Sequence, residues 1–288
     1  MLVYRNLINR ASADFGMGDA LNMRAFLITY CQQKHIRRNS IWVYAPKHWW
    51  MFEREGFLRG TRVKEFSNLT PYKNFGCINI KKRQEFLKLD VCISKNTGVN
   101  YTFDTVVPLP NYPMPNVQLP SEFITFNTGN GCCDPNDRSK LCTKTWPIEH
   151  WEKLIKLIDI PCVQIGSGPS CTHIPGAAVD LVDKLTIKQS AEVLRRAKFH
   201  IDIEGGLPIL NQHLGKKSVV LFGPTSIHQQ GRSMNLNITA GTCNPCYEWV
   251  DSKYDLCVPR DQLKCNKHCM YDLTPELVIN KMKEAAFL

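Results

Sequence analysis

The stretch from Lys198 to Ser226 constrains the fold more than any other part of this chain. Its apolar residues at positions 199–203 and 218–222 predict two buried strands, and the segment at 207–214 predicts a short helix between them. A pair of glycines separates the first strand from the helix. A strand, a helix and a second strand in this order form a βαβ unit, so we expect the two strands to run parallel in an α/β sheet.

The glycine pair lies where a ligand can approach the backbone closely. Gly205 and Gly206 carry no Cβ, and the N–H groups and dipole at the start of the following helix favour an anion such as pyrophosphate. Glu204 lies at the same point, where its carboxylate can accept hydrogen bonds from sugar or ribose hydroxyls. A tight strand-to-helix turn with no ligand is an equally good interpretation of these residues taken alone.

The same alternation of strands and helices recurs on both sides of this unit. It is interrupted between residues 108 and 120 by five prolines, a composition typical of a stiff, extended linker. We therefore predict an α/β protein with two Rossmann-like, doubly wound parallel domains that face each other across a cleft. The predicted domains are residues 1–118 and residues 119–288.

Hydrophobic periodicity and capping residues predict the individual elements. In the amino-terminal half we expect a polar connection at residues 5–15, helices at 20–33 and 49–56, and strands at 2–4, 40–45, 75–80, 91–94 and 101–107. In the carboxyl-terminal half we expect further strands at 122–126, 162–165 and 235–239, and helices that begin at Pro147, Thr186 and Pro275.

Three polar residues lie beside predicted strand ends or helix starts. Asp19 follows the glycine-containing segment 16–18, where it is either an N-cap or a carboxylate at the mouth of a ligand cleft. Thr128 belongs to the loop at 127–131, whose hydroxyl, amides and glycine backbone suit a phosphate or a ribose. Lys144 precedes a helix, where its ammonium either neutralises a diphosphate or is a solvated surface charge.

The chain carries 36 Lys and Arg against 26 Asp and Glu, a net charge of +10. This excess favours polyanionic partners such as nucleic acid, an anionic lipid surface or phosphorylated glycans. The basic clusters are short, so a generally basic surface is the simpler interpretation. No run of 18 apolar residues appears, and residues 1–10 lack the apolar core of a secretion signal, so we expect a cytoplasmic location.

Cysteines gather near the carboxyl terminus. Without a secretion signal, 13 cysteines favour thiols or a metal site over a disulfide framework. The first pair of the cluster has the spacing of a zinc or iron knuckle, and four thiolates would close a tetrahedral structural site. Reduced thiols without a metal are the competing interpretation. The candidate ligands are Cys243, Cys246 and Cys257 with Cys265 or Cys269, and His268 as an alternative.

Five motifs occur in a recognisable order along the chain. They are Gly18-Asp19, Lys144 with Trp146-Pro147 and Trp151, Glu204-Gly205-Gly206-Leu207, Phe222-Gly223-Pro224-Thr225, and a cysteine tail from Cys243 to Cys269 followed by Thr274-Pro275-Glu276. Each is weak alone, but together and in this order they resemble the ADP-heptose:lipopolysaccharide heptosyltransferase family. The likeness covers residues 120–288 well and the amino-terminal half only at its first strand and loop.

The resemblance implies a fold and a reaction. The family is of the GT-B type with twin Rossmann domains, and its members are inverting glycosyltransferases that need no metal for chemistry. A nucleotide-diphosphate sugar, with an ADP-sugar favoured, would bind the carboxyl-terminal domain. Thr128 and Lys144 match positions that hold the donor's phosphates. The turn from Glu204 through Gly205 and Gly206 to Leu207 matches the one that holds the donor sugar and pyrophosphate, and Asp19 matches the catalytic base.

Two departures from the family concern the donor sugar. The family more often has Asp where this chain has Glu204, and often His where it has Ile209, so we expect heptose or another hexose-like sugar. The acceptor would be a hydroxyl of a glycan, a protein or a nucleic acid. The sequence leaves the oligomeric state undecided, and a homo-oligomer is compatible with it. The alternative function is a nucleic-acid-binding module, or a DNA-modifying glycosyltransferase, that uses the basic surface and the cysteine knuckle.

Overall fold

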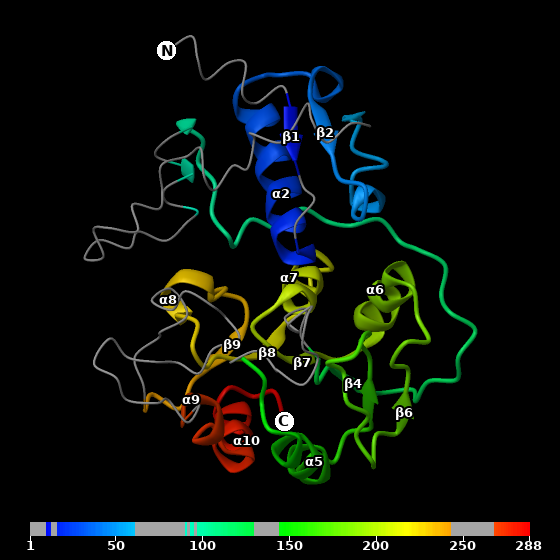
Figure 1. The fold of residues 1–288 in the computed structure, drawn as a ribbon, viewed down its shortest axis with the longest axis vertical. Coiled ribbons are helices and arrows are strands. Elements are labelled where there is room, and N and C mark those ends of the chain that lie inside the picture. The colour runs from blue at the N-terminus through cyan, green and yellow to red at the C-terminus, as the bar shows by residue number, and fades with distance from the viewer. Residues whose placement is uncertain are drawn as a thin grey trace. The chain divides into compact units, whose positions relative to one another are not determined.

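The computed structural model describes residues 10–12, 16–60, 90, 93–94, 97–129, 144–242 and 268–288. The chain forms two compact units, Met1–Leu109 and Pro110–Leu288, which Figure 1 shows as a ribbon. Both units contain helices and parallel strands, so the predicted α/β class is confirmed. The strands expected at residues 2–4 and 75–80 lie outside the described residues.

The first unit holds a parallel sheet of three short strands in the order β1-β2-β3. Helix α2 (Met17–Gln33) follows β1, and its residues from Ala20 to Cys31 are all buried. The helix expected at 20–33 is confirmed, and the strand expected at 40–45 is confirmed at residues 42–44, whereas residue 40 ends a 3₁₀ helix. The remaining elements are β1 (Arg10–Ser12), β2 (Trp42–Tyr44), β3 (Leu58–Arg59) and the 3₁₀ helices η1 (Arg38–Ser40) and η2 (Trp49–Met51).

Four expectations for this unit were wrong. β1 falls inside the stretch expected to be a polar connection, because its Arg-Ala-Ser sequence carries no apolar alternation. The helix expected at 49–56 is reduced to η2 followed by turns. Residues 93 and 94 are helical rather than extended, and residues 101–107 contain turns and no strand.

Packing rather than strand pairing explains the apolar alternation at 101–107. The rings of Tyr101 and Phe103 meet edge to face with their centroids 6.3 Å apart. The Tyr101 hydroxyl donates a hydrogen bond to the Asn22 carbonyl of α2 at 3.0 Å, and the Phe103 N–H donates to the Asp90 carboxylate at 2.6 Å. Side-chain anchors of this kind produce an alternating pattern without a ladder partner.

The second unit is a six-stranded, fully parallel sheet in the order β6-β5-β4-β7-β8-β9. The chain starts at β4, winds outward through β5 and β6, and then returns to add β7, β8 and β9 on the other side. This is the doubly wound order, whose direction reverses between β4 and β7. The strands are β4 (Ile124–Phe126), β5 (Cys162–Gln164), β6 (Val179–Asp180), β7 (His200–Ile203), β8 (Ser218–Leu221) and β9 (Leu236–Ile238).

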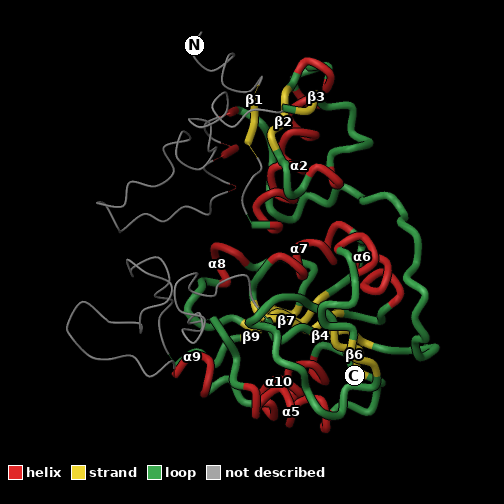
Figure 2. The backbone as a smooth tube through the Cα atoms, turned by 45° about the vertical axis from the view of Figure 1, so that its right-hand side comes forward, coloured by secondary structure: helices red, strands yellow, loops and turns green. Residues whose placement is uncertain are grey.

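Helices cover both faces of this sheet. Figure 2 shows α6 (Ile187–Arg196) and α7 (Gly206–His213) on one face, and α5 (Ile148–Leu157) and α10 (Pro275–Glu284) on the other. The predicted helix starts are confirmed: Thr186 forms a capping box with Gln189, and the Thr274 hydroxyl accepts the Leu277 N–H. Two further short helices are α8 (Ile227–Gln230) and α9 (His268–Tyr271). Among the described residues, none of the helices combines the length and the apolar character needed to cross a bilayer.

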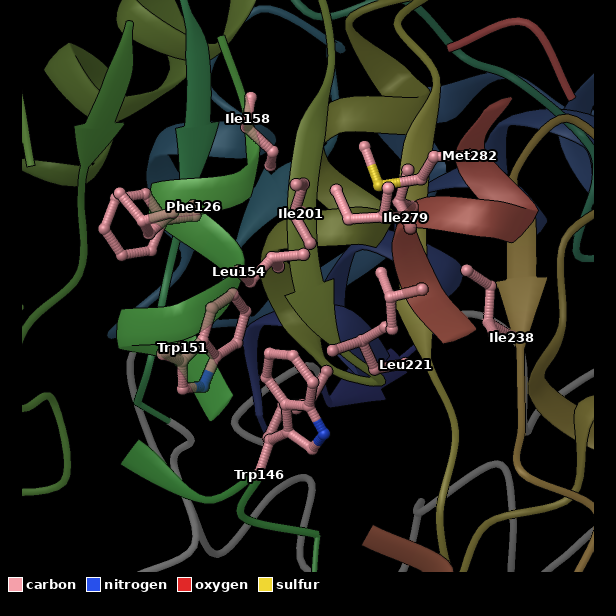
Figure 3. Packing of buried hydrophobic residues seen from close by; sticks show 14 of the residues in the cluster. Phe126, Trp146, Trp151, Leu154, Ile158, Ile201, Leu221, Ile238, Ile279 and Met282 are labelled. Carbon is pink, nitrogen blue, oxygen red and sulfur yellow. The ribbon is translucent and has the colours of Figure 1, made fainter. Parts of the chain in front are cut away.

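The core of the second unit lies between the sheet and the α5–α10 layer. Trp146 and Trp151 are fully buried, and their rings meet edge to face at 4.8 Å. The Trp146 indole N–H donates to the Leu273 carbonyl at 2.8 Å. Figure 3 shows the two indoles packed beside Leu154 of α5 and Leu221 of β8, with Met282 of α10 in the same cluster. Trp146, just before α5, and Trp151, within it, therefore join the carboxyl-terminal helix to the sheet.

The proline-rich segment is attached at its start to the second unit. The Arg195 guanidinium of α6 donates to the Pro110 carbonyl at 3.1 Å, and the Tyr112 N–H donates to the Glu192 carboxylate at 2.8 Å. The chain passes from the first compact unit to the second between Leu109 and Pro110, whereas proline content predicts the boundary between residues 118 and 119.

Candidate functional site

The point where the winding reverses places two loops side by side. β4 and β7 are neighbours in the sheet, with Phe126 paired to Ile201. Because both strands are parallel, the loop after β4 and the turn after β7 emerge at the same edge. Ligands of open α/β sheets bind at such a reversal point, beyond the carboxyl ends of the strands. The segments at this edge are residues 127–129, which are the described part of the loop predicted at 127–131, and the glycine turn at 204–206.

Lys144 is brought to this edge by an ion pair. Its ammonium contacts the Glu204 carboxylate, and only 14% and 15% of the two side chains are exposed. Lys144 lies two residues before the buried Trp146, so the core of the unit anchors its backbone. The structure thus joins two predicted donor-binding residues that are 60 positions apart in the sequence.

The start of α7 provides backbone donors beside this pair. Gly205 is its N-cap residue and contributes no side-chain hydrogen bond, and Gly206 and Leu207 form its first turn. Gly205 has φ near 179°, which any residue can adopt. A Cβ added there would meet nothing closer than the Ile203 carbonyl at 3.7 Å. The fold therefore does not require glycine at 205; the absence of a side chain leaves the backbone accessible at a helix start, where anions bind.

Thr128 has an internal role. Its side chain is 1% exposed, and its hydroxyl donates to the Thr172 carbonyl at 2.8 Å. The Gln164 amide donates in turn to the Thr128 hydroxyl at 3.3 Å. The hydroxyl that the resemblance assigns to a donor phosphate thus holds the loop against residue 172.

A buried polar network beneath the two loops is not anticipated by the sequence motifs. Asn127 donates from its amide to both oxygens of Asp202 at 3.2 Å and to the Gly129 carbonyl at 2.6 Å. The Ile203 N–H donates to Asp202 at 2.7 Å. Burial raises the pKa of the Asp202 carboxyl, and hydrogen bonds from His200 and Asn127 oppose this rise. The network ties the loop after β4 to the last residues of β7.

This network also contains the residue types of a hydrolytic triad. His200 lies with Nδ1 3.0 Å from the Thr125 hydroxyl and Nε2 3.3 Å from Asp202. The three side chains are essentially inaccessible, so no substrate reaches the hydroxyl. The arrangement is structural: His200 and Asp202 are alternate residues of β7 and so lie on the same face of the sheet, and Thr125 of β4 is the register partner of His200.

Asp19 lies in the first turn of α2 and is exposed. Gly16 is the N-cap of that helix, so the N-cap role considered for Asp19 is wrong. One turn further along α2, the buried guanidinium of Arg24 donates to the Val107 and Pro108 carbonyls at 2.8 and 2.9 Å and pairs with Glu55. The helix that carries Asp19 is therefore anchored within the first unit.

Cys269 is the one cysteine of the tail within the described residues. It is buried in α9, where the neighbouring Met270 packs on Gly223. A Cβ added at Gly223 would lie 2.0 Å from the Met270 sulfur, so any side chain at 223 would displace Met270 from its present position. Cys243, Cys246, Cys257 and Cys265 lie outside the described residues. Within the described ranges, no group of acidic, His and Cys side chains could hold a metal.

Comparisons of sequence support the resemblance over part of the chain. No family model matches. Over 91 residues the chain is 30% identical to lipopolysaccharide heptosyltransferase 1 of Escherichia coli strain K12 and 29% identical to the protein of that name from Salmonella typhimurium strain LT2. The first match covers 28% of this chain and 28% of the relative. The matched part is thus well under half the length of the curated relatives.

Comparisons of structure cover nearly all of the chain. The iron-containing dodecameric glycosyltransferase TibC from enterotoxigenic E. coli H10407 matches 96% of this chain and 76% of its own, with a TM-score of 0.67 and 16% identity. ADP-heptose lipopolysaccharide heptosyltransferase II of E. coli matches 96% and 97%, with a TM-score of 0.57 and 14% identity. These likenesses show a shared fold, and with the sequence matches they confirm the resemblance to heptosyltransferases.

Proposed function

We propose that this protein is an inverting glycosyltransferase that moves heptose, or another hexose-like sugar, from an ADP-sugar to an acceptor hydroxyl. The observation that carries the proposal is the meeting of Lys144 with the Glu204-Gly205-Gly206 turn where the winding of the parallel sheet reverses. The partial sequence match to heptosyltransferase 1 supports it, as does the fold shared with TibC, which has been solved in complex with ADP-D-β-D-heptose.

The donor side of the reaction belongs to the second unit. The diphosphate lies at the start of α7, where backbone N–H groups and the helix dipole favour negative charge. The Lys144 ammonium neutralises the diphosphate as it departs from the anomeric carbon. Glu204 accepts hydrogen bonds from hydroxyls of the sugar.

The acceptor side uses Asp19 of the first unit as the base. Its carboxylate takes the proton of the acceptor hydroxyl while the hydroxyl oxygen forms a bond to the anomeric carbon. The bond from that carbon to the diphosphate oxygen breaks on the opposite side, so the configuration inverts and ADP leaves with the bonding electrons. These steps require no metal.

A transfer assay tests this proposal. ADP-heptose is incubated with the protein and, in turn, a glycan, a protein and a DNA acceptor, and ADP release and the anomeric configuration of the product are measured. We expect ADP release that depends on one acceptor class, with an inverted product. If none of the ADP-, UDP-, GDP- and dTDP-sugars releases its nucleoside diphosphate with any of the three acceptors, the proposal is contradicted. Binding of DNA that weakens steeply with salt, without sugar transfer, would instead support the nucleic-acid module, which the comparisons do not favour.

We further propose a structural zinc or iron ion on the cysteine tail. Thiolate sulfurs suit either metal, and TibC is described as iron-containing. A four-sulfur site leaves no open coordination position, so its role is to stabilise the segment that leads into α9 and α10. We expect about one zinc, or a stoichiometric amount of iron, by elemental analysis of the purified protein, and less after Cys243→Ser with Cys246→Ser. Purified wild-type protein that contains neither zinc nor iron and is nevertheless stably folded would contradict this site.

A further inference from the structure

The ion pair between Lys144 and Glu204 joins two groups that the proposed function assigns to different parts of the donor. Lys144 serves the diphosphate, whereas Glu204 serves the sugar. In the structure each is a partner of the other, and about 85% of each side chain is withdrawn from solvent. An ion pair with so little exposure is poorly screened, so parting the two charges has a cost unless each gains a new partner.

The position of the pair makes its carboxylate a competitor of phosphate. Glu204 immediately precedes the N-cap of α7, which is where a diphosphate would bind. A diphosphate at the helix start therefore meets a like charge and must share or take over the ammonium. A sugar attached to the diphosphate compensates, since its hydroxyls give the displaced carboxylate new hydrogen bonds.

We infer that Glu204 competes with the diphosphate for Lys144, and that it thereby makes the site select a sugar-bearing diphosphate over a bare one. A complete donor satisfies both charges, because the ammonium goes to the phosphates and the carboxylate to the sugar. Bare ADP satisfies the ammonium alone and leaves the carboxylate without its counterion. Glu204 is thus a specificity-determining residue that also weakens the hold on the ADP product. This inference rests on the proposed function.

The chain offers a matched control at the opposite end of the same sheet. Lys198 pairs with Glu122 at 3.0 Å, just before the amino ends of β7 and β4, and 49% and 65% of these side chains are exposed. Glu122→Gln removes the same charge from the same unit, but far from the carboxyl ends of the strands. Any general effect of net charge on ADP binding appears in both variants.

The experiment measures the affinities for ADP and ADP-heptose by calorimetry. We expect Glu204→Gln to bind ADP about three- to tenfold more tightly than the wild type, the scale of a single charge interaction at a partly shielded site. The preference for ADP-heptose over ADP should fall by at least the same factor. Glu204→Asp, which keeps the charge, and Glu122→Gln should show no tightening. Glu204→Ala replaces Glu204→Gln if the latter does not fold, as judged by circular dichroism.

A second background separates competition for Lys144 from simple repulsion. In Lys144→Gln, removal of the Glu204 charge should tighten ADP binding by less than it does in the wild type. The inference is overturned if removal of the Glu204 charge tightens ADP binding equally with Lys144 and with Lys144→Gln, or does not tighten it in the wild type. This holds even if the protein binds ADP-heptose and transfers its sugar. If wild-type protein binds neither ADP nor ADP-heptose, the proposed function fails. In that case inorganic pyrophosphate tests the inference. The inference stands if Glu204→Gln binds pyrophosphate more tightly than the wild type does, and it fails otherwise.

Discussion

Asp19→Asn should lower turnover by roughly 10²–10⁴-fold while leaving ADP-heptose binding unchanged, because only the step that removes the acceptor proton needs the carboxylate. Asparagine keeps the size and polarity of the side chain but cannot take a proton. Asp19 is exposed, and asparagine has the same size and can still form hydrogen bonds, so the variant should fold normally. Turnover and calorimetric donor affinity, measured on the same preparation, separate the two effects.

The matched control for this variant is Glu53→Gln. Glu53 is an exposed carboxylate of the same unit, so the change in net charge is the same. Its turnover should stay close to that of the wild type. Unchanged turnover in Asp19→Asn, or a loss of the same size in Glu53→Gln, would remove Asp19 from the mechanism.

Trp146→Ala should destabilise the second unit by about 3–5 kcal/mol, the usual cost of removing a buried indole. The residue is fully buried, packs on Trp151 and donates to the Leu273 carbonyl. Lys144 lies two residues earlier, so the same change should also weaken binding of ADP. Hydrogen exchange of the β7 and β8 amides in increasing urea reports the stability of this unit directly.

Two further variants calibrate this result. Trp146→Phe keeps an aromatic ring but leaves the Leu273 carbonyl without its donor, which should cost about 1–3 kcal/mol. Trp42→Ala removes an indole that is 45% exposed in the first unit, and exchange of the β7 and β8 amides should not respond. Equal responses to Trp146→Ala and Trp42→Ala would mean that the aromatic motif does not hold the second unit together.

The elements of the second unit were predictable because their signals are local. A proline at the start of α5, a capping box at Thr186, the alternating isoleucines of β7 and the apolar run of β8 each specify an element within a few residues. The strand order was not specified in this way. It depends on which strands pair across long separations, so the position of the reversal, between β4 and β7, became visible only in the structure.

The parts that sequence reasoning missed depend on contacts between distant residues. Asn127 and Asp202 are 75 positions apart, and neither belongs to a motif that signals their hydrogen bond. The two-residue strand β6 is too short to show a period. In the first unit, α2 is buried nearly all round, and the alternation at 101–107 comes from packing on that helix rather than from a sheet.

The account as a whole depends on a nucleotide-sugar that lies against the start of α7. Its most direct measurement is the shift in thermal unfolding caused by ADP-, UDP-, GDP- and dTDP-sugars, in wild-type protein and in Gly205→Val. At a concentration of about 100 Kd a bound donor adds about 2.7 kcal/mol, or about 5–10 °C for a unit of this size. We expect that shift for the ADP-sugar with the wild type. Gly205→Val should unfold near the wild-type temperature, because a Cβ at this position makes only ordinary van der Waals contact with the Ile203 carbonyl. It should show no shift, because its side chain blocks the helix start. No shift with any of the four sugars, or equal shifts in both proteins, would contradict the account.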